Sequence, residues 1–163
     1  RRRAPQAQRV RFRSPPAKGF ERKLEMLKIL CHKHIPEIMQ WTGLQTRPLF
    51  VPSVGNFAQG MLVQLPLHRD QLAAGTDKAR LAGVFEAHYG NSRFVRVVRH
   101  EDAADTGKLD ALALADTNDL EIHVFRNDTH GHSLLVARLD NLGKGASGAA
   151  VQNLGLMFDW PAA

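Results

Sequence analysis

The chain has 163 residues, 44% of them hydrophobic and 23% charged, which is enough for one medium-sized domain with a substantial core. No apolar run reaches the length needed to cross a bilayer, and the single cysteine excludes an internal disulfide, so a cytoplasmic location is expected. The net charge of +6 is concentrated in residues 1–30, which carry +8, whereas residues 31–163 carry −2, so a nucleic-acid binder with a basic folded face is not expected.

Residues 1–30 are predicted to be a basic extension of unclear origin. The first twenty residues contain no acid, and residues 1–19 hold three prolines without sustained periodicity. Two interpretations stay open, a disordered arm and a transit-type segment. The following "FERKLEMLKIL" is compatible with an amphipathic helix or with a strand. Because the chain does not begin with methionine, we expect it to be processed or a fragment.

The stretch "HKHIPEIMQWTGL" predicts a short helix. Pro36 suits the first turn, Glu37 favours the positive end of the helix dipole, and Gly43 is a natural stop. Downstream, Thr76 is expected to cap a helix over residues 77–89. The apolar face of that helix is predicted to hold Leu81, Val84, Phe85, His88 and Tyr89.

Alternating and turn-bounded apolar runs predict several strands. Their ranges are 47–52, 57–67, 93–99, 120–126 and 133–140, with a turn at 53–56 and a polar hairpin tip before the last strand. A glycine-rich turn and an apolar helix at 146–158 close the chain. Strands outnumber helices and hairpins dominate, so the predicted fold class is α+β with a mainly antiparallel sheet and flanking helices.

The closing stretch "DNLGKGASGAAVQNLGLMF" is the first candidate for a site. Gly143 and Gly145 would let a ligand approach the backbone, and a helix beginning near Ala146 would direct free N–H groups at it. Lys144 adds a positive charge, and Asn141 offers an amide donor and acceptor. The alternative is a tight packing turn between a strand and a helix.

The second candidate is "HKHIPEI". If His32 and His34 lie on an extended segment, they face the same side, and Glu37 could hold one imidazole in a fixed tautomer. Such a histidine can act as a general acid or base near neutral pH. Two ordinary polar histidines at a helix entry remain the alternative.

Metal and thiol chemistry are not expected. His32, His34, His130 and His132 could be zinc ligands, but cysteine and acid ligands at suitable spacing are lacking. Cys31 ends an apolar run and is predicted to be buried, which does not suit a reactive thiolate.

Taken together, the two motifs resemble the N-acetyl-gamma-glutamyl-phosphate reductases of arginine biosynthesis. The intervening "PSVGNFAQGMLVQLPL" and "HYGNSRFVRVV" are similar to the shorter bacterial branch of that family, and the likeness runs from about Cys31 to Pro161. The resemblance implies the C-terminal domain of an enzyme built like glyceraldehyde-phosphate dehydrogenase. Residues 31–145 would be a substrate and dimerisation domain. Residues 146–163 would be a helix that packs on a Rossmann domain absent from this chain.

The resemblance also implies the chemistry. Such an enzyme converts N-acetyl-gamma-glutamyl phosphate to N-acetylglutamate semialdehyde through a cysteine thioester, with a hydride from NADPH. The family nucleophile lies upstream of the histidine motif, in the wrong place for Cys31 to replace it, so this chain alone is expected to be inactive. A homo-oligomer is expected, without membrane or nucleic-acid partners. The alternatives are a non-catalytic remnant and an interaction domain with a basic arm.

The resemblance assigns roles residue by residue. The catalytic histidine matches His34, with Glu37 in the same motif. We assign substrate contacts to His32 and to Gln59, which stands where larger members often carry arginine. The residues that match the family's cofactor-binding turn are Asn141, Gly143, Lys144, Gly145 and Gly148.

Overall fold

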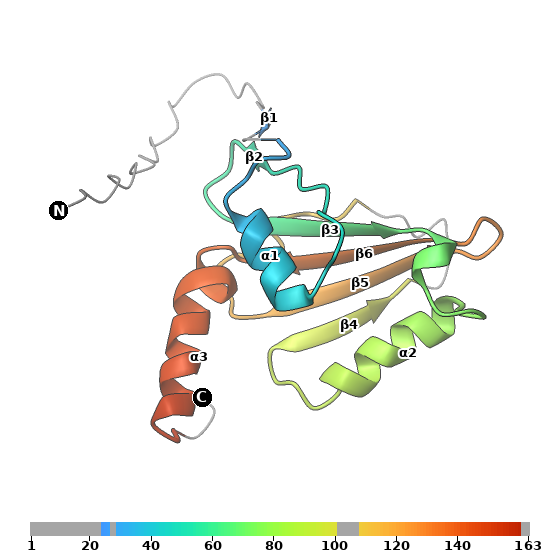
Figure 1. Ribbon diagram of the computed structural model, residues 1–163. Coiled ribbons are helices and arrows are strands. Elements are labelled where there is room, and N and C mark those ends of the chain that lie inside the picture. Colours follow the sequence, from blue (N-terminus) through green and yellow to red (C-terminus); the bar gives the residue numbers. More distant parts are fainter. Residues whose placement is uncertain (1–23, 27–28, 101–107, 161–163) are drawn as a thin grey trace. The chain divides into compact units, whose positions relative to one another are not determined.

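The computed structural model describes residues 24–26, 29–100 and 108–160, and the chain divides into two compact units that meet between Asn56 and Phe57 (Figure 1). This division differs from the functional limits expected at residues 31–145 and 146–163, which stay a prediction. The basic segment before residue 24 lies outside the described residues. None of the helices in the described ranges is long and apolar enough to span a membrane.

The first unit contains a two-stranded antiparallel sheet. Strand β1 (Leu24–Met26) pairs with β2 (Ser53–Gly55). The predicted strand at 47–52 and turn at 53–56 are therefore wrong, and the helix considered for "FERKLEMLKIL" is not formed at β1. A strand of three residues forms only when it is paired with another strand. The sequence of residues 53–56 favours a turn and gives no information on the pairing with β1, which lies far away in the sequence.

The first helix confirms the prediction made from its punctuation. Helix α1 spans His34–Thr42 and carries Pro36 in its first turn. It ends at Gly43, which adopts φ +69° and donates its N–H to Met39 O at 3.0 Å. A left-handed conformation of this kind is the usual reason for glycine after a helix. Ile35 is fully buried and anchors the helix start.

The second unit is built on a four-stranded sheet. Its strands are β3 (Met61–Leu67), β4 (Val95–Arg99), β5 (Leu120–Asn127) and β6 (His132–Leu139), in the order β3-β6-β5-β4 (Figure 1). The β3–β6 and β5–β6 pairings are antiparallel and β4–β5 is parallel. The sheet is thus mixed and mainly antiparallel, which confirms the α+β class, and the predicted β5–β6 hairpin is present.

Helix α2 (Lys78–Tyr89) covers one face of this sheet over β4 and β5, after a short 3-10 turn, η1 (Arg69–Gln71) (Figure 1). Its core contacts join Leu81 and Ala82 to Ile122 and Val124 of β5. These two strand residues alternate with Glu121 and His123, which consequently lie on the opposite face. One sheet face is therefore apolar under α2, and the other carries charged groups.

Two details of α2 differ from expectation. Its N-cap is Asp77, whose Oδ1 accepts from the backbone N–H of Arg80 at 2.7 Å, whereas Thr76 Oγ1 donates to Ala73 O. A carboxylate one residue later is the stronger acceptor for the free N–H groups of the first turn. Val84 and His88 were predicted on the apolar face but are exposed, Val84 at 61%, because Leu81, Phe85 and Tyr89 are the residues that face the sheet.

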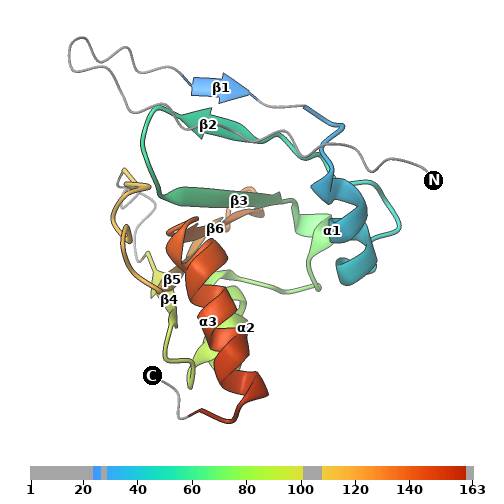
Figure 2. The ribbon, with the colours of Figure 1, turned by 90° about the vertical axis from the view of Figure 1, so that its left-hand side faces the viewer.

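The chain ends in a helix that projects from one end of the sheet (Figures 1 and 2). A π-helical turn, η3 (Gly143–Ser147), leads into α3 (Gly148–Met157), so the helix expected at 146–158 begins as a wider turn. No residue of α3 is buried. Its large exposed apolar side chains are Val151, Leu154, Leu156 and Met157.

Candidate functional site

The glycine-rich turn is organised by Asp140, a residue that sequence analysis did not single out. Its side chain is buried, at 2% exposure. Oδ1 accepts from the N–H groups of Leu142 at 2.8 Å and Gly143 at 3.1 Å, and Oδ2 accepts from Asp116 N at 2.8 Å. The N–H groups of Gly143 and then Leu142 lower the pKa of Asp140. An aspartate two and three residues before free N–H groups is a recognisable local signal for such a turn.

The same turn gathers predicted residues from distant parts of the sequence. Gln59 Nε2 donates to Asp116 Oδ1 at 2.7 Å and to Asp140 Oδ2 at 3.3 Å. Gly60 N donates to Asn141 Oδ1 at 2.7 Å. The structure thus brings Gln59, predicted for substrate, and Asn141, predicted for cofactor, to one loop. Within the described part of the chain Asn141 Nδ2 has no acceptor, so it remains available as a donor.

The three glycines of the turn differ in whether the structure leaves room for a side chain at their positions. A Cβ on Gly143 would lie 2.6 Å from Thr117 O, and one on Gly148 would lie 2.1 Å from Asn118 Oδ1. These two positions need glycine for close packing against the segment before β5, as the packing-turn alternative states. A Cβ on Gly145 would meet nothing closer than 3.4 Å, and this exposed backbone stays open to a ligand.

The expected set of free N–H groups at the start of the last helix is not present. Ser147 N donates to Leu142 O at 3.0 Å, and Gly148 N donates to Gly143 O. The π-helical turn extends the helix backwards and satisfies these donors. The expectation of an anion-directed helix start near Ala146 is therefore wrong in this respect.

A cavity of about 650 Å³ lies beside α3, and one residue of its wall has a buried oxygen without a hydrogen bond. Its lining includes Asn118, whose Oδ1 is buried and has no hydrogen-bond partner among the described residues. A buried acceptor without a partner is rare and needs an explanation. Close by, Lys144 Nζ donates to Gln152 Oε1 at 2.7 Å and lies 5.6 Å from the centroid of the Phe94 ring. Sequence analysis missed Asn118 because only the fold reveals its burial.

The histidine motif lies in the first unit. The rings of His32 and His34 are 4.5 Å apart at their centroids, and both contact the ring of Phe50, at 5.1 and 6.5 Å. His32 Nδ1 also accepts from His34 N at 3.3 Å. The two imidazoles share a side, as predicted, although His34 begins a helix instead of lying on a strand. The side chain of His34 is exposed and accessible.

Two expectations for this motif are corrected. Among the described side chains Glu37 forms no hydrogen bond or ion pair with His34, because the His34 ring packs toward His32 and Phe50 and the glutamate is exposed. Cys31 is exposed, whereas burial was predicted, and its Sγ donates to Ile29 O at 3.3 Å. In the described ranges no group of three His, Cys, Asp or Glu side chains is arranged to hold a metal ion.

The protein family described as semialdehyde dehydrogenase, dimerisation domain, matches residues 16–141. The match starts earlier than the motifs indicated, so residues 16–30, in which no likeness was recognised, are part of it. Curated relatives named N-acetyl-gamma-glutamyl-phosphate reductase are 48% identical in Allorhizobium ampelinum, 50% in Burkholderia cenocepacia and 48% in Sinorhizobium medicae, each over 79% of this chain. The match covers 41–42% of each relative, so the chain spans about two fifths of their length.

Proposed function

Because the chain belongs to the semialdehyde dehydrogenase dimerisation-domain family, we propose that it is the substrate and dimerisation part of an N-acetyl-gamma-glutamyl-phosphate reductase. One observation carries the proposal: identity of 48–50% over 129 residues with relatives of that name. The proposed reaction is NADPH-dependent reduction of the acyl phosphate to N-acetylglutamate semialdehyde in the cytoplasm. The cysteine nucleophile and the nucleotide domain would be contributed by the part of the relatives that this chain does not match, so the chain alone would be inactive.

In the proposed mechanism, His34 moves the protons. A cysteine thiolate attacks the acyl carbon, the C–O bond to phosphate breaks, and a thioester forms. His34 takes the thiol proton at an imidazole nitrogen in this step. Once a hydride has been added to the thioester carbon, the C–S bond breaks and releases the aldehyde and the cysteine thiolate, and His34 would return its proton to that sulfur. The exposed ring of His34 supports this role.

Glu37 and His32 have supporting roles in this proposal. Without a contact to His34, Glu37 would act on the histidine through its charge at the start of α1. His32 Nδ1 accepts a hydrogen bond from the His34 backbone N–H, and the His32 ring packs against the His34 ring. Both contacts would orient the His34 side chain at the start of α1. Gln59 would position substrate through its carbonyl, because its amide nitrogen is bonded to Asp116 and Asp140.

The cofactor-binding role proposed for the glycine turn suits the nicotinamide end of NADP better than its phosphates. When bound in its reduced form, NADPH would supply the hydride. The N–H groups of Ser147 and Gly148 are already bonded within the chain, which disfavours a phosphate cradle. Asn141 Nδ2 remains as a donor and Asn118 Oδ1 as a buried acceptor, and a carboxamide needs both kinds of partner. Gly145 leaves backbone open to approach, while Lys144 would contribute charge beside α3.

The exposed apolar side chains of α3 support a further part of the proposal. A helix with Val151, Leu154 and Leu156 exposed has a large apolar surface for a folded protein of this size. We propose that the nucleotide domain of the complete enzyme covers this surface. The family name supports association of two or more copies through the rest of the chain.

A graft tests the proposed function. The matched 129-residue segment of the Burkholderia cenocepacia relative would be replaced by the corresponding residues of this chain. Phosphate-dependent reduction of NADP with N-acetylglutamate semialdehyde is expected for the graft and not for the 163-residue chain alone. A correctly folded graft without activity would contradict the proposal, and the unaltered relative serves as the positive control.

A further inference from the structure

A second cavity, of about 530 Å³, lies in the second unit near the β5–β6 hairpin and the end of β4. Phe125, Leu134 and Pro66 supply an apolar part of its wall. Five further lining residues have cationic or imidazole side chains: Lys78, Arg126, His68, His100 and His132. Of the described residues that line this cavity, none is an Asp or a Glu. A concave site with apolar walls and several cationic or donor groups is suited to an organic anion.

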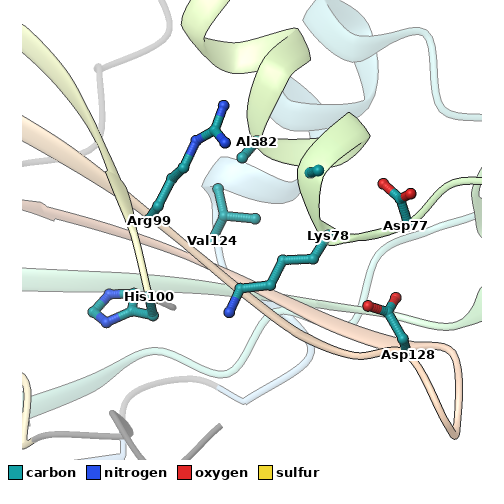
Figure 3. A pocket seen from close by; sticks show the side chains of 8 residues that line it. Asp77, Lys78, Ala82, Arg99, His100, Val124 and Asp128 are labelled. Atoms are coloured by element: carbon teal, nitrogen blue, oxygen red, sulfur yellow. The ribbon is translucent and has the colours of Figure 1, made fainter. Parts of the chain in front are cut away.

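The neighbouring cavity provides a contrast. It measures about 370 Å³ and shares Lys78 and His100, but its lining includes the carboxylates Asp77 and Asp128 (Figure 3). Its arginine, Arg99, makes a bidentate ion pair with Glu86. Figure 3 shows the His100 ring and the Arg99 side chain pointing in different directions from the end of β4. An anion would favour the larger, carboxylate-free cavity because no carboxylate lines it; its Arg126 is paired with Asp128, but its Lys78 has no carboxylate partner among the described residues.

Two positively charged side chains of the larger cavity differ in whether a carboxylate of the chain already binds them. The side chain of Arg126 is 3% exposed, and it donates to Asp128 Oδ1 and Ser133 Oγ, both at 2.6 Å. Its fork has five N–H donors, so these two bonds leave further donors. Lys78 is half-buried and forms no ion pair with a carboxylate in the described ranges. One cation is thus fixed and the other is available to a ligand.

A chain of hydrogen bonds from Glu121 through His123 holds the ring of His100. His123 Nε2 lies 3.2 Å from Glu121 Oε2, and His123 Nδ1 lies 2.9 Å from His100 Nε2. The carboxylate requires a proton on His123 Nε2, so His123 Nδ1 accepts from His100 Nε2–H. Burial, followed by the charge of Arg138, lowers the pKa of His123, which supports its neutral form. The bond to His123 and the stacking on Phe125 hold the His100 ring in the cavity wall.

We propose that the carboxylate-free cavity binds a small organic carboxylate, with its anionic group toward Lys78 and Arg126. The apolar body lies against Phe125 and Leu134. Phe125 is held in place by the His100 ring, which stacks on it with centroids 4.1 Å apart. The lining shares no residue with the glycine turn or the histidine motif, and the proposal does not depend on the proposed reductase activity.

Calorimetric titration of benzoate into the 163-residue chain at low ionic strength tests this site. Acetate and inorganic phosphate are the parallel probes, because acetate lacks the apolar body and phosphate tests a bare anion site. Benzoate is expected to bind with a Kd near or below about 1 mM, and at least about tenfold tighter than either probe. Equal binding of benzoate and acetate, or tighter binding of phosphate, overturns the proposal.

Charge-matched variants locate the site. Lys78→Gln is expected to weaken benzoate about tenfold, whereas Lys108→Gln removes an exposed lysine outside the cavity and leaves Kd unchanged. Thermal melts check that both variants fold. His132→Gln, at an exposed position, gives a second variant with an expected loss of threefold or more. Identical affinities for the lysine variants, or no heat of binding with the parent chain, overturn the assignment.

Discussion

His123 is the residue at which the sheet is most sensitive to pH. Its side chain is 3% exposed, between Glu121 and His100, and Arg138 also bonds to Glu121. The Glu121 carboxylate favours a charged imidazole, but burial and the arginine lower the pKa of His123. The folded chain therefore holds this histidine neutral at pH values at which the unfolded chain begins to protonate it.

The sign of the resulting pH dependence follows from proton binding. Below about pH 6.5 the unfolded state binds a proton that the folded state refuses, so the free energy of unfolding decreases as the pH falls. One such proton contributes at most about 1.4 kcal/mol per pH unit. Denaturant unfolding at pH 7.5, 6.5 and 5.5 measures the slope.

His123→Gln removes the titrating group and keeps an amide that can bond to both neighbours. We expect its slope below pH 6.5 to be smaller than that of the parent chain. His88→Gln, at an exposed position of α2, is the matched control and should leave the slope in place. A parent slope that persists in His123→Gln would show that another group is responsible.

At the scale of elements, the glycine turn depends on the segment before β5. Gly143 packs against Thr117 O, and the Asp140 carboxylate bonds to the N–H of Asp116 from the same segment. These contacts join the start of α3 to the loop on which β5 begins. The helix direction is thus determined by backbone packing of the turn, since α3 itself buries no residue.

Two glycine substitutions in helical backbone distinguish packing from propensity. Gly143→Ala places a Cβ 2.6 Å from Thr117 O and should destabilise the chain by about 1–3 kcal/mol. Gly83→Ala, in α2, meets nothing within 4 Å and should stabilise it by about 0.5–1 kcal/mol. Urea unfolding of both variants provides the comparison. If Gly143→Ala left the free energy of unfolding unchanged, the turn would be able to shift and accommodate the Cβ without cost, against this prediction.

Elements with a strong local signal were predictable from sequence. Helix α1 has Pro36 and Gly43 as punctuation, and the β5–β6 hairpin alternates on both sides of a polar tip. β2 was not predictable, because it is a strand only through its pairing with β1. The wider π-helical entry to α3 was missed because the position of its first turn depends on Asp140 and on the loop at Thr117.

The candidate site was predictable only in part. The spacing of His32 and His34 predicted that their rings share a side, although His34 begins a helix and not the extended segment assumed, and the glycine turn was singled out by its composition. The bonds of Gln59 to Asp116 and Asp140 join positions far apart in sequence, so no local pattern reports them. Likewise, the stack of His100 on Phe125 needs the parallel β4–β5 register, which periodicity does not specify.

At the scale of the whole molecule, the exposed apolar side of α3 is the surface that we propose the nucleotide domain covers. Leu156 is 79% exposed in this chain, so Leu156→Gln should change its stability by less than about 0.5 kcal/mol. If the nucleotide domain covers α3 in the graft, the same substitution should destabilise the graft by about 2 kcal/mol. Thermal melts of chain and graft measure the difference. Ala150→Gln, an exposed position on the same helix, is the control, and equal effects of Leu156→Gln in both proteins would argue against docking.

The central claim is that His34 transfers the protons of a reductase. The most direct measurement is kcat for phosphate-dependent NADP reduction by the graft, with His34→Asn and His32→Asn as a matched pair in the same motif. Asparagine keeps a planar polar group but does not exchange a proton near neutral pH, so His34→Asn should lower kcat about a hundredfold or more with a smaller effect on KM. His32→Asn should retain most of the turnover, and thermal melts should show both variants folded. Near-native kcat for the folded His34→Asn graft, or an equal loss in the two variants, would contradict the account.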